Sequence, residues 1–247
     1  MTGVEVRRAD SRAVTRLPWL DSRHTFSFGR HYDPANTSFG QLLTSNEDRV
    51  QAGAGFAPHP HRDLEVVTWV LSGSLVHEDS TGVRGVVRPG QVQRMTAGRG
   101  VLHAETNDAW RLDGGPVHDQ PVHLVQMWVA PDAAGLEPGY EQRDVGAELG
   151  AGGLVALASG RGRDAAVRLS QRDATLHAAR LAPDQVVTLP DAPYLHVQVT
   201  RGEVVLEGAG ALDPGDTARC TEAGARRVTA TAQAEVLVWE MHSRLGS

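Results

Sequence analysis

Two short segments of the chain each place two potential metal ligands one residue apart. The first segment carries His59 and His61, and the second carries His103 and Glu105. Residues i and i+2 of a β-strand point to the same face, so each segment can direct both side chains into one cavity. Three imidazoles and one carboxylate converging there would form a four-ligand site for a divalent transition metal.

This donor set suits several ions, namely Fe(II), Mn(II), Ni(II), Cu(II) and Zn(II). In an octahedral shell, four protein ligands leave positions open for a substrate and for dioxygen or water. Zinc more readily takes a closed tetrahedral site. The pattern therefore favours an open, redox-capable centre over structural zinc, with metal-free surface or core histidines as the competing interpretation.

The segments around the ligand pairs have the spacing of a β-barrel. Short apolar, β-branched runs alternate with glycine turns: Val66 to Leu71 ends at Gly73, and Val92 to Thr96 leads through Gly98 to the second pair. Short strands at close, regular turn spacing predict an all-β sandwich or jelly-roll barrel rather than βαβ units.

The strand-and-turn pattern then recurs, which indicates a duplicated domain. We expect a metal-binding barrel over residues 1–132, a Gly-, Pro- and Ala-rich linker over 133–153, and a second barrel over 154–247. Aligning the turns of the two halves places four non-ligating residues opposite the four candidate ligands: Thr188, Pro190, Val228 and Ala230. The second half is therefore predicted to bind no metal.

Composition excludes several classes of protein. The single cysteine, Cys220, rules out a disulfide framework within the chain and argues against a thiolate cluster. A formal net charge of −6 and scattered arginines argue against direct nucleic-acid binding. No apolar run is long enough for a membrane helix or resembles a secretory signal, so a soluble cytoplasmic protein is expected.

Other polar residues have structural explanations that compete with a role in the site. His77 alternates with Glu78 and Asp79, which favours a solvated or hydrogen-bonded role over metal ligation. Glu65 follows the first pair closely and could support the ligands or form a salt bridge with Arg62.

The chain from about residue 20 to 130 resembles the pirin family of bicupins, especially its bacterial quercetinase-like members. The resemblance is carried by five motifs: His24-Thr25-Phe26-Ser27-Phe28, Pro58-His59-Pro60-His61-Arg62-Asp63-Leu64-Glu65, Thr68-Trp69-Val70-Leu71-Ser72-Gly73, His77-Glu78-Asp79-Ser80-Thr81-Gly82 and Gln93-Arg94-Met95-Thr96-Ala97-Gly98-Arg99-Gly100-Val101-Leu102-His103-Ala104-Glu105. The second half shares only a cupin-like rhythm.

The resemblance implies two facing β-barrels with one metal, usually iron, in the first barrel. His59, His61, His103 and Glu105 match the family's ligand positions, and Mn, Ni, Cu, Co or Zn are alternatives to Fe(II). Some members open the flavonol quercetin with dioxygen, whereas others regulate protein partners.

We therefore expect a monomeric dioxygenase that acts on a small aromatic substrate, with Glu105 as catalytic base. The alternative is a metal-containing, redox-sensitive regulator that acts through a protein partner.

Overall fold

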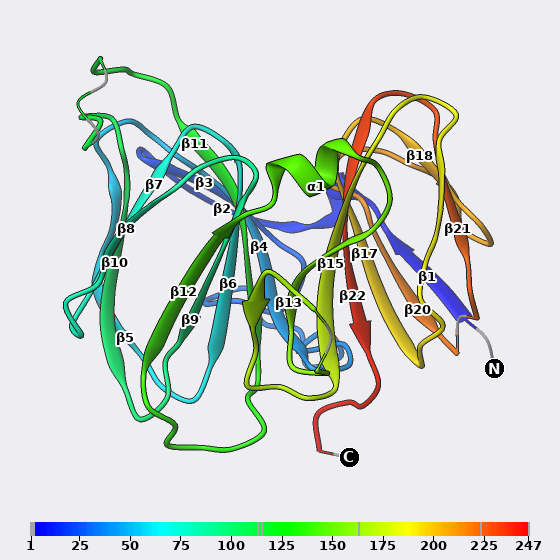
Figure 1. Ribbon diagram of the computed structural model, residues 1–247, viewed down its shortest axis with the longest axis horizontal. Coiled ribbons are helices and arrows are strands. Elements are labelled where there is room, and N and C mark those ends of the chain that lie inside the picture. Colours follow the sequence, from blue (N-terminus) through cyan, green and yellow to red (C-terminus); the bar gives the residue numbers. More distant parts are fainter. Residues whose placement is uncertain (1–2, 113, 115, 163, 223, 247) are drawn as a thin grey trace.

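The computed structural model describes residues 3–112, 114, 116–162, 164–222 and 224–246. It consists of two β-barrels that lie side by side (Figure 1). Each barrel combines a seven-stranded sheet with a four-stranded sheet. Among the described residues, the helical elements are the short 3-10 helix η1 (Ala9–Ser11) and the α-helix α1 (Gly146–Gly150). The expected all-β class with two barrels is confirmed.

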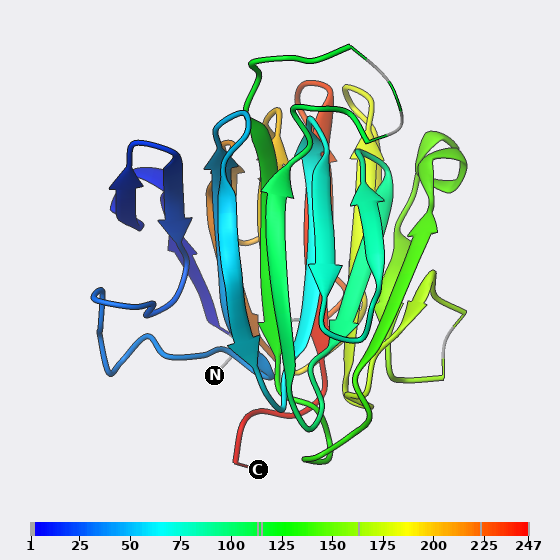
Figure 2. The same ribbon diagram turned by 90° about the vertical axis from the view of Figure 1, so that its left-hand side faces the viewer.

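The N-terminal barrel is built from antiparallel strands, seen from outside in Figure 2. Its large sheet has the order β12 (Gly139–Asp144), β9 (Gln91–Thr96), β6 (Glu65–Ser72), β11 (Val122–Val129), β4 (Leu42–Val50), β3 (Leu20–His24) and β2 (Ala13–Leu17). Its small sheet has the order β5 (Gly55–His61), β10 (Val101–Asn107), β7 (Leu75–Asp79) and β8 (Arg84–Val87).

The C-terminal barrel repeats this plan. Its large sheet has the order β1 (Gly3–Arg7), β20 (Thr217–Thr221), β17 (Tyr194–Arg201), β22 (Ala234–Met241), β15 (Ala174–Leu181), β13 (Val155–Ser159) and β14 (Val167–Arg168). Its small sheet has the order β16 (Val186–Thr188), β21 (Arg227–Ala230), β18 (Val204–Leu206) and β19 (Gly210–Leu212).

The two large sheets pack face to face through an apolar core. Alternation along β6 sends Val67, Trp69 and Leu71 toward the other barrel, where they join buried side chains such as Leu176 and Trp239. Two tryptophans also bond across this interface, because the Trp69 indole donates to Glu235 (2.9 Å) and the Trp239 indole to the Met127 sulfur (3.2 Å). This shared core holds the barrels together.

The boundaries of the barrels differ from the sequence-based division at two places. Strand β1 pairs with β20, so the first residues of the chain complete the C-terminal sheet. The segment 133–153, expected as a linker, contains β12 and α1, and β12 extends the N-terminal sheet by pairing with β9. Both differences arise from pairing between strands that are distant in sequence, and such pairing cannot be predicted from local composition.

The interiors of the barrels differ. Aliphatic side chains fill the C-terminal barrel, including Val197, Val204, Val228 and Ala230. The N-terminal barrel has two smaller apolar clusters, one around Val70 and Leu75 and one around Val66 and Met95, and it also buries polar side chains such as His77. No helix among the described residues is long and apolar enough to cross a membrane.

Candidate metal centre

The two ligand segments become neighbouring strands of the small sheet. Strands β5 and β10 pair antiparallel with His59 directly opposite His103. Along β10, every second residue from Val101 to Asn107 is buried, and this set includes His103 and Glu105. The strand alternation predicted for both pairs is therefore present.

Proline positions on β5 suit the edge of a sheet. Strand β5 has one neighbour, β10. Pro58 and Pro60 are exposed, and they alternate with His59 and His61. Proline lacks a backbone N–H, so an edge strand tolerates it without loss of a ladder bond.

A β-bulge separates the two ligands of β10. The register with β5 shifts between His103, which faces His59, and Glu105, which faces Phe56. Gly55 lies next to this shift, where an added Cβ would lie 2.2 Å from the Glu105 carbonyl oxygen. Only glycine therefore allows the two backbones to approach this closely, and the bulge changes the direction of Glu105 relative to β5.

The donor atoms form two groups that share one residue. Ligand atoms of His59, His61 and His103 lie within 4.8 Å of one another, and so do those of His77, His103 and Glu105. Glu105 is therefore close to His103 but does not join the three-histidine group at this distance. Among the described residues, no comparable group lies in the C-terminal barrel.

Several donor atoms in these groups have no hydrogen-bond partner. These atoms are shielded from solvent: Nε2 of His61, both ring nitrogens of His103 and Oε1 of Glu105. In His59, Nδ1 donates to the Ala57 carbonyl (2.8 Å), which leaves Nε2 as the lone-pair nitrogen of the neutral ring. Unused nitrogen and carboxylate donors at one place fit a divalent transition metal.

Burial keeps the histidines in the neutral form that can ligate. It lowers the pKa of His61 to about 4, with a smaller contribution from His59. It also lowers the pKa of His103 to about 3, helped by the charges of His59, His61 and His77. Both rings are therefore unprotonated near pH 7.

Glu105 is held through one oxygen only. Its Oε2 accepts a hydrogen bond from the Gln126 amide (2.7 Å), and the Trp128 indole donates to the other end of that amide (3.1 Å). Burial raises the pKa of Glu105 to about 7, against the opposing effect of the Gln126 hydrogen bond. The second oxygen remains available to an ion or a substrate.

His77 is the residue of these groups that we did not expect from the sequence. It is fully buried, faces Glu105 across the β7–β10 pair, and hydrogen-bonds to Asp79 and Gln93 (both 3.2 Å). The hydrogen-bonded alternative for His77 thus agrees with the structure, and the solvated one does not. The clue in the sequence was its alternation with Asp79, but only the cross-strand register places it beside Glu105.

Glu65 has a structural role instead. It is fully buried and accepts a long hydrogen bond (3.3 Å) from the backbone of Ser170 in the other barrel. Arg94, and not Arg62, is its nearby cation, with an N–O distance of 3.9 Å. Glu65 therefore belongs to the contact between the barrels.

A cavity of about 350 Å³ opens on the metal-binding groups. His59, His61 and Glu105 line one part of it, and four aromatic rings line much of the rest: Trp19, Phe28, Phe56 and Trp128. Aromatic walls next to unused donor atoms suit a flat, largely apolar ligand.

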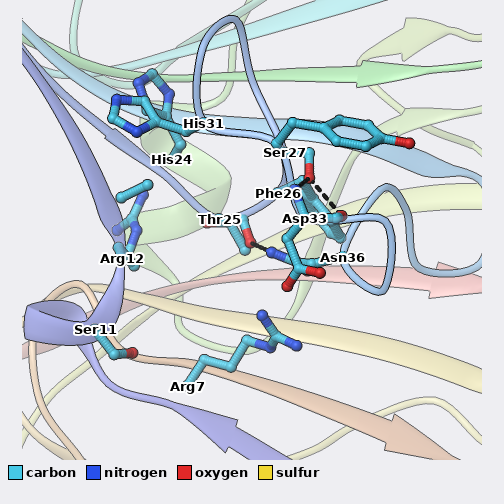
Figure 3. Close-up of a pocket in the computed structure, with 12 residues that line it drawn as sticks. Arg7, Ser11, Arg12, His24, Thr25, Phe26, Ser27, His31, Asp33 and Asn36 are labelled. Carbon is cyan, nitrogen blue, oxygen red and sulfur yellow. Dashed lines mark hydrogen bonds between the residues drawn. The ribbon is translucent and has the colours of Figure 1, made fainter.

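His24 separates this cavity from a second one, of about 300 Å³. Figure 3 shows the second cavity between the N-terminal segment with Arg7 and Arg12 and the loop that carries Asp33 and Asn36. That loop is fixed by its own bonds, such as the Asn36 amide to the Thr25 carbonyl (3.1 Å). None of the residues that line this second cavity belongs to either metal-binding group.

The family comparisons cover both barrels. Residues 6–129 match the pirin model, and residues 156–241 match the model of the quercetinase C-terminal cupin domain. The similarity of the second half therefore extends beyond the strand-and-turn pattern to a specific cupin domain, and the chain has the expected bicupin fold.

Relatives and solved structures agree with these matches. A Mycobacterium tuberculosis protein provisionally named quercetin 2,3-dioxygenase is 53% identical, over 98% of this chain and 97% of that protein. Quercetin 2,3-dioxygenase from Escherichia coli K12 is 34% identical, over 96% and 98% of the two chains. The crystal structure of the bacterial pirin YhhW from E. coli in complex with nickel(II) has a TM-score of 0.87 and 32% identity, covering 98% of this chain and 100% of that one. This chain is therefore a member of the pirin family.

Proposed function

We propose that this protein is a metal-dependent dioxygenase that opens a flavonol-like substrate with dioxygen. The observation that carries the proposal is the set of unpartnered donor atoms that opens on an aromatic-lined cavity. The similarity of this chain to the quercetin 2,3-dioxygenase of E. coli, which covers nearly the whole length of both proteins, supports this substrate class.

The ligands in this proposal are His59, His61, His103 and Glu105, which would hold one divalent transition metal. Iron is the first choice from the family, and nickel is the ion bound in the YhhW complex. When bound, the ion would supply Lewis acidity that lowers the pKa of a substrate hydroxyl. Because His103 belongs to both metal-binding groups, it is the residue on which the site depends most.

The remaining steps fall to residues of the chain. Glu105 would accept the proton of the substrate hydroxyl, and the Gln126 amide, which donates to Oε2, would hold the carboxylate in place. The rings of Trp128 and Phe28 contact each other edge to face (5.5 Å between centroids) and would position the flat substrate while they exclude water.

The test combines oxygen uptake with metal analysis of the same sample, using quercetin as the substrate. We expect turnover by the metal-loaded protein, and a sharp loss of both metal and turnover in His61→Ala and His103→Ala. In Glu105→Gln we expect turnover to fall more than metal content, since an amide can ligate but cannot take up the proton. His242→Ala, a histidine outside both groups, is the matched control. A metal-loaded protein that consumes no oxygen would refute the enzymatic proposal.

The regulatory alternative draws on a separate observation. The connection between β10 and β11 exposes three large apolar side chains, Trp110, Leu112 and Val117. Exposed apolar side chains in one segment are typical of contacts with a protein partner. A metal-loaded protein without turnover, whose affinity for a partner changes with the oxidation state of its metal, would favour this function. The cytoplasmic location and the monomeric state remain predictions.

A further inference from the structure

Part of the wall of the cavity beside the metal-binding groups has no role in the proposed chemistry. It is formed by the large sheet, where Ser22 and His24 of β3 lie opposite Asp48 and Asn46 of β4. Residues 22 and 24 are two positions apart on β3, and residues 46 and 48 are two positions apart on β4, so all four side chains point to the same face of the sheet. The metal-binding groups come from the small sheet, so a ligand in the cavity lies between the two sheets.

Most polar atoms on this wall already have partners. The ring nitrogens of His24 are bonded to Thr15 (2.8 Å) and Asn46 (2.9 Å), and the Gln126 amide joins Trp128 and Glu105. These side chains are fixed by the protein itself, so they offer little to a ligand.

Asp48 is the exception. Its side chain is buried, with 4% of its surface exposed, and its Oδ1 has no hydrogen-bond partner. The neighbouring buried cation, Arg12, forms its ion pair with Glu47 (2.9 Å), and the described part of the chain gives Asp48 no ion pair. A buried carboxylate oxygen without a donor is costly, and a ligand hydroxyl can supply the missing donor.

The charge of the site selects among ligands that could meet Asp48. A carboxylate repels an anionic group, and a metal at the neighbouring groups would repel an ammonium group. A neutral hydroxyl donor avoids both penalties. The cavity is also lined by the aromatic rings of Trp19 and Phe56, which are in edge-to-face contact (5.3 Å between centroids). These rings favour a ligand whose hydroxyl is carried by an aromatic ring of its own.

We propose that Asp48 is a specificity residue, which accepts a hydrogen bond from a second phenolic hydroxyl of the substrate, distinct from the hydroxyl that meets the metal. This inference rests on the proposed flavonol substrate. It predicts that the protein distinguishes flavonols by the hydroxyls on the ring remote from the reacting one.

The experiment compares three flavonols that differ only in these hydroxyls: quercetin with two, kaempferol with one and galangin with none. Binding is measured anaerobically with protein loaded with Zn(II), through quenching of the pocket tryptophans, so that the result does not depend on turnover. We expect galangin to bind the wild-type protein about tenfold or more weakly than quercetin, as for loss of a hydrogen bond to a charged group.

Two variants test whether Asp48 is the cause. In Asp48→Asn, which keeps a weaker acceptor, the quercetin-to-galangin ratio should fall, and in Asp48→Ala it should approach one while galangin affinity stays unchanged. Asp21→Asn is the matched control, because this carboxylate precedes Ser22 on β3 and does not line the cavity. The Asn variant is nearly isosteric, so it retains the fold if the Ala variant does not.

The outcomes separate this inference from the proposed enzymatic function. An unchanged ratio in both variants, or no flavonol binding at all, would overturn the role of Asp48. A ratio that falls in the variants, in a protein without turnover, would support the role of Asp48 and refute only the dioxygenase proposal.

Discussion

At the residue scale, the two acidic side chains of the cavity are held in different ways. Glu105 has a hydrogen-bond donor on one oxygen and belongs to a metal-binding group. Asp48 has no ion pair in the described structure and a bare oxygen. This difference in environment is the reason for proposing Glu105 as a metal ligand and Asp48 as a group that binds substrate.

The first prediction concerns the pH dependence of stability in the metal-free protein. Burial raises the pKa of Asp48 from 3.8 to about 6, opposed by the Ser22 hydroxyl and the charge of Arg12. The folded state therefore binds more protons than the unfolded state between about pH 4 and pH 6, so Asp48 lowers the free energy of unfolding as pH rises through this window. Asp48→Asn removes this effect.

Thermal unfolding of the two proteins between pH 4 and pH 7.5 measures the difference. The variant should gain stability relative to wild type as pH rises, reaching a plateau above pH 6. The expected gain in the free energy of unfolding across this range is roughly 3 kcal/mol. If the difference in stability between the two proteins stayed constant with pH, the pKa of Asp48 would not be raised by burial.

The second prediction ranks the histidines by metal retention. His103 belongs to both metal-binding groups, whereas His61 and His77 belong to one each, and both nitrogens of His77 already have partners. We expect metal content after dialysis against a weak chelator to fall most in His103→Ala, less in His61→Ala and least in His77→Ala. Equal losses in His77→Ala and His103→Ala would make His77 a ligand and require a new ligand set.

At the element scale, the geometry of the centre depends on how β5 and β10 approach each other. A bulge lies between His103 and Glu105, and Gly55 makes the close approach of the two strands possible. Within 4.8 Å, Glu105 groups with His77 and His103. Strand pairing, and not only strand identity, therefore sets which donors meet.

The third prediction is that Gly55→Ala disturbs the centre without removing a ligand. The added methyl would meet backbone atoms of Glu105 and Thr106, which are not free to move as a side-chain tip would be. We expect a loss of roughly 1–3 kcal/mol in stability and weaker metal retention. Gly150→Ala is the control, because its Cβ would meet nothing within 4 Å. If Gly55→Ala behaved like this control, the close pairing beside Glu105 would be unnecessary for the site.

At the scale of the whole molecule, the two barrels differ, because the cavity with the metal-binding groups belongs to the N-terminal barrel. The interior of the C-terminal barrel is filled by aliphatic side chains, and its large sheet supports the N-terminal barrel through the shared core with Trp69 and Trp239. The duplicated half therefore serves as a scaffold for the first.

The fourth prediction is a stoichiometry of one metal per chain. Val228 and Ala230, at the positions aligned with His103 and Glu105, are fully buried among aliphatic neighbours and provide no donor. Elemental analysis of protein purified after metal loading measures the ratio. A ratio near two, with the second ion lost on substitution within residues 154–242, would contradict the duplication argument.

The fifth prediction concerns nucleic acid. The formal net charge of −6 gives little attraction for phosphate, and arginines such as Arg12, Arg94 and Arg180 are engaged with acidic partners. We expect no binding of duplex DNA at physiological salt. Binding that weakens steeply as salt rises would show a basic surface that acts despite the net charge.

The amino-acid sequence alone was enough for the properties that depend on neighbours along the chain. The alternation of His59 with His61, and of His103 with Glu105, placed each pair on one strand face, because side-chain direction in a strand repeats every two residues. Turn glycines and apolar runs indicated two barrels, and the alignment of their turns singled out the first barrel as the metal site.

Only the tertiary structure decided which faces meet. The bulge beside Gly55, the register that brings His77 opposite Glu105, and the inward position of Asp48 all depend on pairing between strands distant in sequence. A one-residue change of register exchanges the two faces of a strand, so periodicity within a single segment cannot reveal these neighbours. The same reason explains why β1 completes the second barrel although it begins the chain.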